Sequence, residues 1–132
     1  MLESLIGFFR GEGKISVAYL FGSYVKGRRD PFSDVDVALL LSEEPKSLKE
    51  LLEYYLYLLN GLSDILGDRV DLIILNVSPP LLRYQVIKHG RVVYSRDERA
   101  RVGFEARSLR EYLDLSRVTG RYDECLVRQA LA

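Results

Sequence analysis

The chain has 132 residues, of which 48% are hydrophobic, and its 19 basic side chains balance 19 acidic ones. This size supports one hydrophobic core, so we expect a single domain over 1–132, and the balanced charge excludes an overall field that would attract nucleic acid or anionic lipid. No apolar run is long enough to span a membrane, no secretory signal precedes the first strand and Cys125 stands alone, so we expect a cytoplasmic protein without direct contacts to membrane or nucleic acid.

The first predicted elements are a short helix and two strands. Apolar residues at helical spacing over 2–9 predict an amphipathic helix, which ends at the glycines that follow. Residues 14–21 become β-branched and aromatic, which is typical of a buried strand, and they lead into a tight turn at Gly22-Ser23. A second strand is predicted over 34–41, so the two strands bracket a polar loop.

A long helix and a third strand come next. Ser47 and Glu50 fit a capping box at the start of a helix over 48–66, and Gly67 ends it. The apolar run after Gly67 predicts a third strand over 69–76.

The second half of the chain predicts two more helices and an edge strand. Ser78-Pro79-Pro80 is typical of a capped helix start, and that helix closes at His89-Gly90 before a short edge strand over 91–95. A C-terminal helix is predicted over 97–119, with a tail over 120–132 that we expect to be loosely held. Val102, Ala106, Leu109 and Leu113 form one apolar stripe on this helix, flanked by many Arg and Glu residues.

These elements predict an α/β (α+β) fold. A small mixed β-sheet, built from residues 14–95, would carry the functional site at one edge and have helices packed on one face.

Three acidic residues stand out because the predicted strands place them together. Asp34 and Asp36 lie two residues apart on one strand, so their side chains project from the same face. Asp71 joins them if the third strand is a neighbour of the second. Clustered carboxylates repel one another unless a cation lies between them, and oxygen ligands suit Mg2+ or Mn2+ rather than zinc. The pattern predicts a site for one or two such ions, which would support an in-line phosphoryl displacement.

The Gly22-Ser23 turn supplies the complementary half of this site. Glycine lets backbone amides approach a phosphate, and the serine hydroxyl can donate a hydrogen bond to it. Lys26, Arg28 and Arg29 follow, and at least one of them can neutralise a triphosphate or a departing pyrophosphate. The segment therefore indicates a nucleotide-binding loop.

The spacing of Gly22-Ser23, ten further residues and Asp34-x-Asp36 resembles the signature of the polymerase-beta nucleotidyltransferase superfamily. Within it, the chain is similar to the minimal nucleotidyltransferases (MNT), and this resemblance extends from about residue 14 to residue 115. Weaker motifs add to it at Val70-Asp71-Leu72, Leu82-Arg83-Tyr84-Gln85-Val86, Gly90-Arg91-Val92-Val93-Tyr94, Phe104-Glu105 and Tyr112-Leu113.

The resemblance implies a polymerase-beta-type fold and an antitoxin of the HEPN/MNT type. Such a protein transfers AMP from ATP to a tyrosine hydroxyl of a helical HEPN ribonuclease toxin and releases pyrophosphate. In this mapping Asp34 and Asp36 bind Mg2+, and Asp71 completes the metal site and activates the attacking hydroxyl. Nucleotide binding is assigned to Gly22, Ser23, Lys26 and Ser33. Many members carry arginine at the position of Lys26, and lysine keeps the charge but loses the bidentate geometry.

Two other functions are compatible with these residues. A catalytically silent antitoxin would cover its toxin by mass action, and a third kind of protein would transfer nucleotides to a small molecule such as an aminoglycoside. Three converging acids argue against the silent antitoxin, because a protein that only binds does not need them. The lack of an added substrate domain argues against a small-molecule acceptor. Arg83, Lys88 and Arg91 are further candidates for a basic rim near the site, with a solvated charged surface as the alternative.

Overall fold

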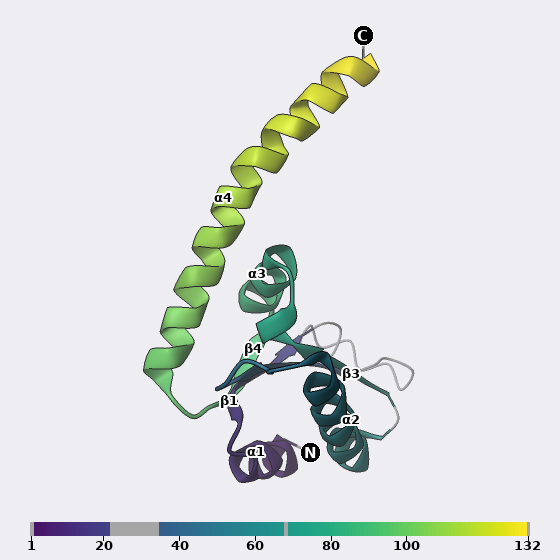
Figure 1. Ribbon diagram of the computed structural model, residues 1–132, viewed down its shortest axis with the longest axis vertical. Helices are drawn as coiled ribbons and strands as arrows, with labels where there is room; N and C mark the ends of the chain where they lie inside the picture. Colours follow the sequence, from purple (N-terminus) through teal and green to yellow (C-terminus); the bar gives the residue numbers. More distant parts are fainter. Residues whose placement is uncertain (1, 22–34, 68, 132) are drawn as a thin grey trace.

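The computed structural model describes residues 2–21, 35–67 and 69–131, with side chains as far as residue 117. Every helix and strand expected from the sequence is present, and within the described ranges the structure adds the short 3-10 helix η2. In chain order the elements, shown in Figure 1, are α1 (Leu2–Gly11), β1 (Ile15–Phe21), β2 (Val35–Leu41), α2 (Leu48–Leu66), β3 (Val70–Ile74), η2 (Leu75–Val77), α3 (Pro80–His89), β4 (Arg91–Ser95) and α4 (Glu98–Leu131).

The four strands form one mixed sheet in the order β3-β2-β1-β4. β1 is antiparallel to both of its neighbours, β2 and β4, whereas β2 and β3 are parallel. The parallel pair requires a crossover connection, which α2 provides by returning the chain to the starting end of the sheet. The expected mixed sheet and the edge position of β4 are confirmed.

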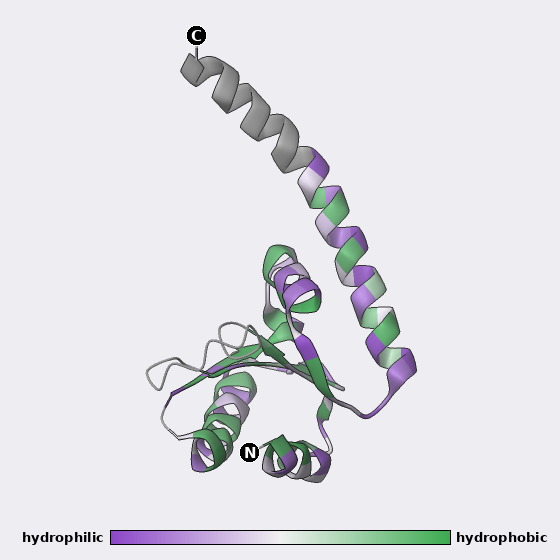
Figure 2. Ribbon diagram, turned by 180° about the vertical axis from the view of Figure 1, so that it is seen from behind, coloured by the Kyte–Doolittle hydropathy of each residue, from purple (hydrophilic) through white to green (hydrophobic). Residues whose placement is uncertain are grey.

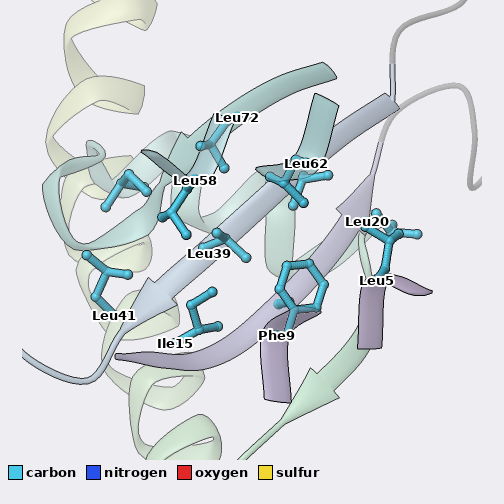
Figure 3. Close-up of a cluster of buried hydrophobic side chains, with 12 residues drawn as sticks. Leu5, Phe9, Ile15, Leu20, Leu39, Leu41, Leu58, Leu62 and Leu72 are labelled. Carbon is cyan, nitrogen blue, oxygen red and sulfur yellow. The ribbon is translucent and has the colours of Figure 1, made fainter. Parts of the chain in front are cut away.

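One face of the sheet is covered by α1 and α2 (Figures 1 and 3). Phe9 from α1 and Leu58 and Leu62 from α2 are fully buried against the strands, and each such side chain stabilises the fold by about 1.5–3 kcal/mol. The buried cluster on this face consists of Leu5, Phe9, Ile15, Ala18, Leu20, Val37, Leu39, Leu41, Leu58, Leu62, Leu72 and Ile74.

The opposite face also carries helices, whereas the sequence predicted helices on one face only. α3 and the first turns of α4 pack there over a second, smaller cluster (Figure 1). The strands require this cover, because β1 and β2 turn apolar side chains to both faces of the sheet. The buried members of this second cluster are Val17, Tyr19, Ala38, Leu75, Val86 and Phe104.

The ends of α2 follow the expected local signals. Glu50 N donates a 3.1 Å hydrogen bond to Ser47 Oγ, and the Glu50 side chain accepts one from Lys46 N at 3.3 Å. At the other end Gly67 has a φ of 84°, which glycine adopts without strain, and its N–H donates to Ser63 O at 2.8 Å. The local sequence therefore sets both boundaries of this helix.

The start of α3 differs from the expected cap at Ser78. Ser78 Oγ instead donates a 2.8 Å hydrogen bond to Ile74 O, because η2 turns the chain back toward the end of β3. Pro79 occupies the cap position and makes no side-chain cap hydrogen bond. Pro80 has no N–H to be satisfied and its φ is already helical, so α3 begins without a side-chain cap.

α4 is longer than predicted and ends at Leu131 rather than near residue 119. Gly120 costs about 1 kcal/mol inside a helix, but no proline follows it and the next residues are mostly good helix formers. The C-terminal part of α4 extends away from the other elements (Figure 1), and hydrophilic and hydrophobic residues alternate along the coloured part of α4 in Figure 2. Even so, no helix in the described part of the chain is long and apolar enough to cross a membrane.

The apolar stripe that the sequence shows on α4 is not the face that packs on the sheet. Phe104 and Ser108 are the buried residues of the described part of α4. Within the apolar stripe of the sequence, Val102 is 55% exposed, Leu109 45% and Leu113 50%. The helix therefore has two sides with apolar residues, and the fold covers one of them.

Two tertiary contacts select the buried side of α4. Tyr19 of β1, 1% exposed, donates a 2.9 Å hydrogen bond to Glu105, and Arg101 donates to both oxygens of the same carboxylate. Burial and the hydrogen bond to Glu105 raise the pKa of Tyr19, so its hydroxyl stays protonated and continues to donate. Further along, the rings of Tyr84 and Tyr112 stack with centroids 3.7 Å apart, which joins α3 to α4.

We predict that Tyr19→Phe lowers the free energy of unfolding by about 1 kcal/mol, because it removes a buried hydrogen bond and keeps the ring packing. Urea denaturation followed by circular dichroism measures this loss. Tyr57→Phe is the matched control, since Tyr57 donates a 2.6 Å hydrogen bond to Glu12 but is 55% exposed. Its loss should be smaller, and equal losses in the two variants would contradict the anchoring role of Tyr19.

Candidate active site

Asp36 and Asp71 lie side by side on neighbouring strands. In the parallel pairing of β2 with β3, Asp36 is the direct partner of Asp71. Neighbouring strands lie about 4.8 Å apart, and directly paired residues in parallel strands project from the same face. The sequence analysis expected Asp71 to join Asp36 if the two strands are neighbours, and this juxtaposition is confirmed.

The two carboxylates project from the sheet face that α3 and α4 partly cover. Their chain neighbours Val37 and Leu72 are buried on the α1–α2 face, so the alternation of side chains places both acids on the opposite face. Asp36 is half-buried and Asp71 is exposed. A reactant can therefore reach Asp71 from solvent, while Asp36 lies closer to the body of the protein.

Phe21 connects this pair to the predicted phosphate turn. It is the last residue of β1, it pairs with Asp36, and it packs against the same cluster as α3 and α4. The chain continues from Phe21 directly into Gly22-Ser23, so the turn starts from the strand end beside Asp36. Sequence reasoning did not single out Phe21, although its position before Gly22 was the available signal.

The rest of the predicted site lies outside the described residues. Asp36 and Asp71 provide two adjacent carboxylates, an oxygen donor set that fits Mg2+ or Mn2+ better than zinc. Within 2–21, 35–67 and 69–131, no three acidic, histidine or cysteine side chains are grouped to hold a metal ion. The roles of all the site residues stay predictions. Those outside the described ranges are Gly22, Ser23, Lys26, Ser33 and Asp34.

Of the three residues predicted to form a basic rim, Arg83 lies away from the carboxylate pair. Arg83 donates hydrogen bonds to the carbonyl of Leu75 at 3.0 Å and to that of the following residue, beyond the far end of β3 from Asp71. Arg91 pairs with Leu20, next to the end of β1 beside Asp36, so its place at a rim of the site stays a prediction. Lys88 lies over the ring of a tyrosine in its own helix. The positions of these residues in the sequence could not show that Arg83 donates its hydrogen bonds to backbone carbonyls of η2.

A cavity of about 410 Å3 lies at the opposite end of β2 from Asp36. It is lined by the last residues of β2, by η2, by α3 and by the first turns of α4. In its wall Glu111 forms a 3.2 Å ion pair with Arg83. The cavity is therefore separate from the carboxylate pair.

Comparison with known families identifies the class of protein. The family model described as "Polymerase beta, Nucleotidyltransferase" matches residues 3–99, which are 97 of the 132 residues. The matched range includes all four strands, the carboxylate pair and the Gly22-Ser23 turn. The chain therefore belongs to this nucleotidyltransferase family.

Individual relatives agree with this assignment. A protein of Methanocaldococcus jannaschii, provisionally named a protein adenylyltransferase, is 43% identical over 63 residues, which cover 48% of this chain and 59% of that protein. The similarity thus spans about three fifths of that relative's length. A chain from a crystal structure of a toxin-antitoxin complex with AMP-PNP is similar with a TM-score of 0.74 and 23% identity, over 99% of this chain and 98% of the other.

A second solved structure has the same fold. It is described as a tri-AMPylated HEPN toxin of Shewanella oneidensis in complex with an MNT antitoxin. The similarity has a TM-score of 0.69 and 22% identity, over 99% of this chain and 96% of the other. These likenesses confirm the polymerase-beta-type fold along nearly the whole chain, α4 included.

We predict that ATP with Mg2+ raises the melting temperature of the protein, whereas ATP with excess chelator does not. Adjacent carboxylates oppose an approaching triphosphate until a cation lies between them, and a ligand at 100 times its Kd stabilises the fold by about 2.7 kcal/mol. Differential scanning fluorimetry measures the shift.

Asp36→Asn and Asp71→Asn should each reduce that shift. Asp64→Asn is the matched control, because Asp64 is an exposed carboxylate on α2. An equal shift in Asp36→Asn and in the unmodified protein would argue against this metal site.

Proposed function

We propose that this chain is a Mg2+-dependent adenylyltransferase that transfers AMP from ATP to a tyrosine hydroxyl of a HEPN-domain toxin and thereby acts as its antitoxin. The observation that carries the proposal is the in-register pair of Asp36 and Asp71 beside the strand that leads into Gly22-Ser23. The family assignment and the fold shared with toxin-antitoxin complexes support it.

The proposed division of roles follows from the burial of the two acids. Half-buried Asp36, together with Asp34, would hold the cation and fix the position of the α-phosphate. Exposed Asp71 is reachable by an incoming hydroxyl, so it would accept the tyrosine proton as the oxygen attacks. When bound, Mg2+ would neutralise the phosphate charge and orient the nucleotide for in-line attack.

In the proposed reaction the tyrosine oxygen forms a bond to the α-phosphorus. The bond from that phosphorus to the bridging oxygen breaks, and pyrophosphate leaves with the electron pair. The hydroxyl proton passes to Asp71 and then to solvent. Ser23 and Lys26 are assigned to the phosphates, where a positive charge lowers the cost of releasing pyrophosphate.

Turnover distinguishes this proposal from a silent binding antitoxin. We predict that a substoichiometric amount of the chain, incubated with a HEPN toxin, ATP and Mg2+, adds adenylyl groups to the toxin, which intact-mass spectrometry detects. The modified toxin should stay inactive as a ribonuclease after separation, because the phosphodiester persists when the enzyme leaves.

Asp71→Asn serves as the control for that experiment. It should lose transfer but still form the complex, because Asp71 is assigned to the proton and not to the interface. If no adenylyl mass appears and inhibition instead requires equimolar complex, the silent-binder function replaces the catalytic one. Transfer to an aminoglycoside but not to the toxin would favour a small-molecule acceptor.

Lys26 provides a test of the phosphate loop, which lies outside the described residues. We predict that Lys26→Ala lowers kcat/KM for ATP by about tenfold or more, because a charge that neutralises the leaving pyrophosphate is lost. Lys26→Arg should keep or raise the activity, since arginine restores the bidentate geometry. Steady-state pyrophosphate release measures both variants, and inactivity of Lys26→Arg would show that the lysine has another task.

A further inference from the structure

The two long sides of α4 have different surroundings. One side, with Phe104 and Ser108 buried, packs on β1 and α3. The other side carries Val102, Ala106, Leu109 and Leu113, at successive spacings of four, three and four residues, and all four are exposed. At about 100° per residue this second stripe lies on the side of the helix away from the sheet.

An uncovered stripe of this length is not accounted for by the fold itself. Its four residues span about 17 Å along the helix axis, at 1.5 Å per residue. Surface helices normally direct their apolar stripe toward a core, and contiguous exposed apolar surface marks an interaction site. α4 also continues to Leu131, beyond its contacts with the sheet, as an arm on one side of the molecule (Figure 1).

A row of arginines borders one edge of this stripe. Arg99, Arg107, Arg110 and Arg117 are exposed, and none of them forms a side-chain hydrogen bond or ion pair with the part of the chain that the structure describes. By helical spacing they fall within roughly 80° of one another, next to the stripe, and Arg99 and Arg107 also line the cavity described above.

The acidic residues near the other edge of the stripe are already engaged. Glu98 and Glu105 both pair with Arg101, which lies on the sheet side. Asp114 is exposed and falls within the arginine row by helical spacing, so four positive charges and one negative charge border the arginine edge and the net charge beside the stripe is positive.

This charge pattern indicates which kind of partner fits the outer face of α4. Antiparallel association of a second copy through the same stripe would bring two arginine rows together, and like charges at an interface are unfavourable. A helix with an apolar stripe and an edge of Asp and Glu would instead cover the apolar residues and neutralise the row.

We propose that the outer face of α4, defined as this stripe and its arginine row, is the docking surface for an acidic amphipathic helix of the partner protein. The inference rests on the proposed function, in which that partner is a helical HEPN-domain toxin. Docking along α4 would supply binding energy outside the carboxylate site, so that complex formation and AMP transfer depend on separate residues.

Isothermal titration calorimetry with a purified HEPN toxin tests the surface directly. Leu109→Ser with Leu113→Ser should weaken binding by about tenfold or more, because apolar anchors near the centre of an interface carry much of its affinity. Leu52→Ser with Leu56→Ser is the matched control, since these α2 leucines are 51% and 57% exposed but lie on the other face of the sheet. Circular dichroism and the Mg2+–ATP melting shift of each variant verify that the fold and the nucleotide site are intact.

A designed peptide separates the inference from the proposed function. The probe is a synthetic helix with leucines at heptad positions a and d and glutamates at e and g, and its comparison peptide has lysines in place of the glutamates. Fluorescence anisotropy at low salt should show binding of the glutamate peptide alone. Arg110→Glu with Arg117→Glu should reverse this preference.

The outcomes are distinct for the two proposals. Suppose that the toxin is adenylylated, and that the α4 variants bind both the toxin and the glutamate peptide with the affinity of the unmodified chain. The proposed docking surface is then wrong and the proposed function stands. If the peptide binds as predicted but no HEPN toxin is bound or modified, the function is wrong and the stated partner is wrong with it. If sedimentation shows a dimer that Leu109→Ser with Leu113→Ser dissociates, the face belongs to a second copy and the proposed occupant is overturned.

Discussion

The parallel, in-register pairing of β2 with β3 is the constraint on which the candidate site depends. It places Asp36 and Asp71 on one face, at the same level of the sheet, although they are 35 residues apart in the sequence. A slip of one residue would turn Asp71 to the α1–α2 face and remove Leu72 from the core. The apolar core on one face therefore enforces the alignment of the carboxylates on the other, so the packing of α2 against β3 is also a functional requirement.

The opposite face of the sheet combines packing and chemistry. Toward the middle of β2 it is apolar, with Ala38 buried beneath the second cluster, and toward the beginning of β2 it is acidic. α3 and α4 cover the apolar part and leave Asp71 exposed. The short strand β3 shows the same division, since Ile73 packs against the second cluster two residues after Asp71.

α4 links the fold to the proposed partner. Tyr19 and Glu105 fix the beginning of the helix to β1, and the stacked pair Tyr84 and Tyr112 fixes the next turns to α3. These contacts orient the helix about its own axis, and that orientation leaves Val102 and its stripe facing outward. In the function that we propose, the contacts that anchor α4 on the sheet therefore also present the docking surface.

Local chemistry in the sequence determined most of the elements and the type of site. Strand and helix boundaries followed from periodicity and glycines, as at Gly67, and the spacing from Gly22 to Asp36 identified the nucleotidyltransferase family that the comparison then confirmed. The sequence alone predicts that Asp34 and Asp36 project from the same face, because side chains two residues apart on a strand share a face.

Only the tertiary structure decided which strands are neighbours, and hence that Asp71 stands beside Asp36. It also decided that helices cover both faces of the sheet and which side of α4 is buried. A helix with two apolar sides contains no local signal that decides which of them packs on the sheet. The buried side of α4 depends on tertiary contacts such as the hydrogen bond from the Tyr19 hydroxyl of β1 to Glu105, 86 residues later in the chain. No local sequence pattern predicts a contact between residues so far apart.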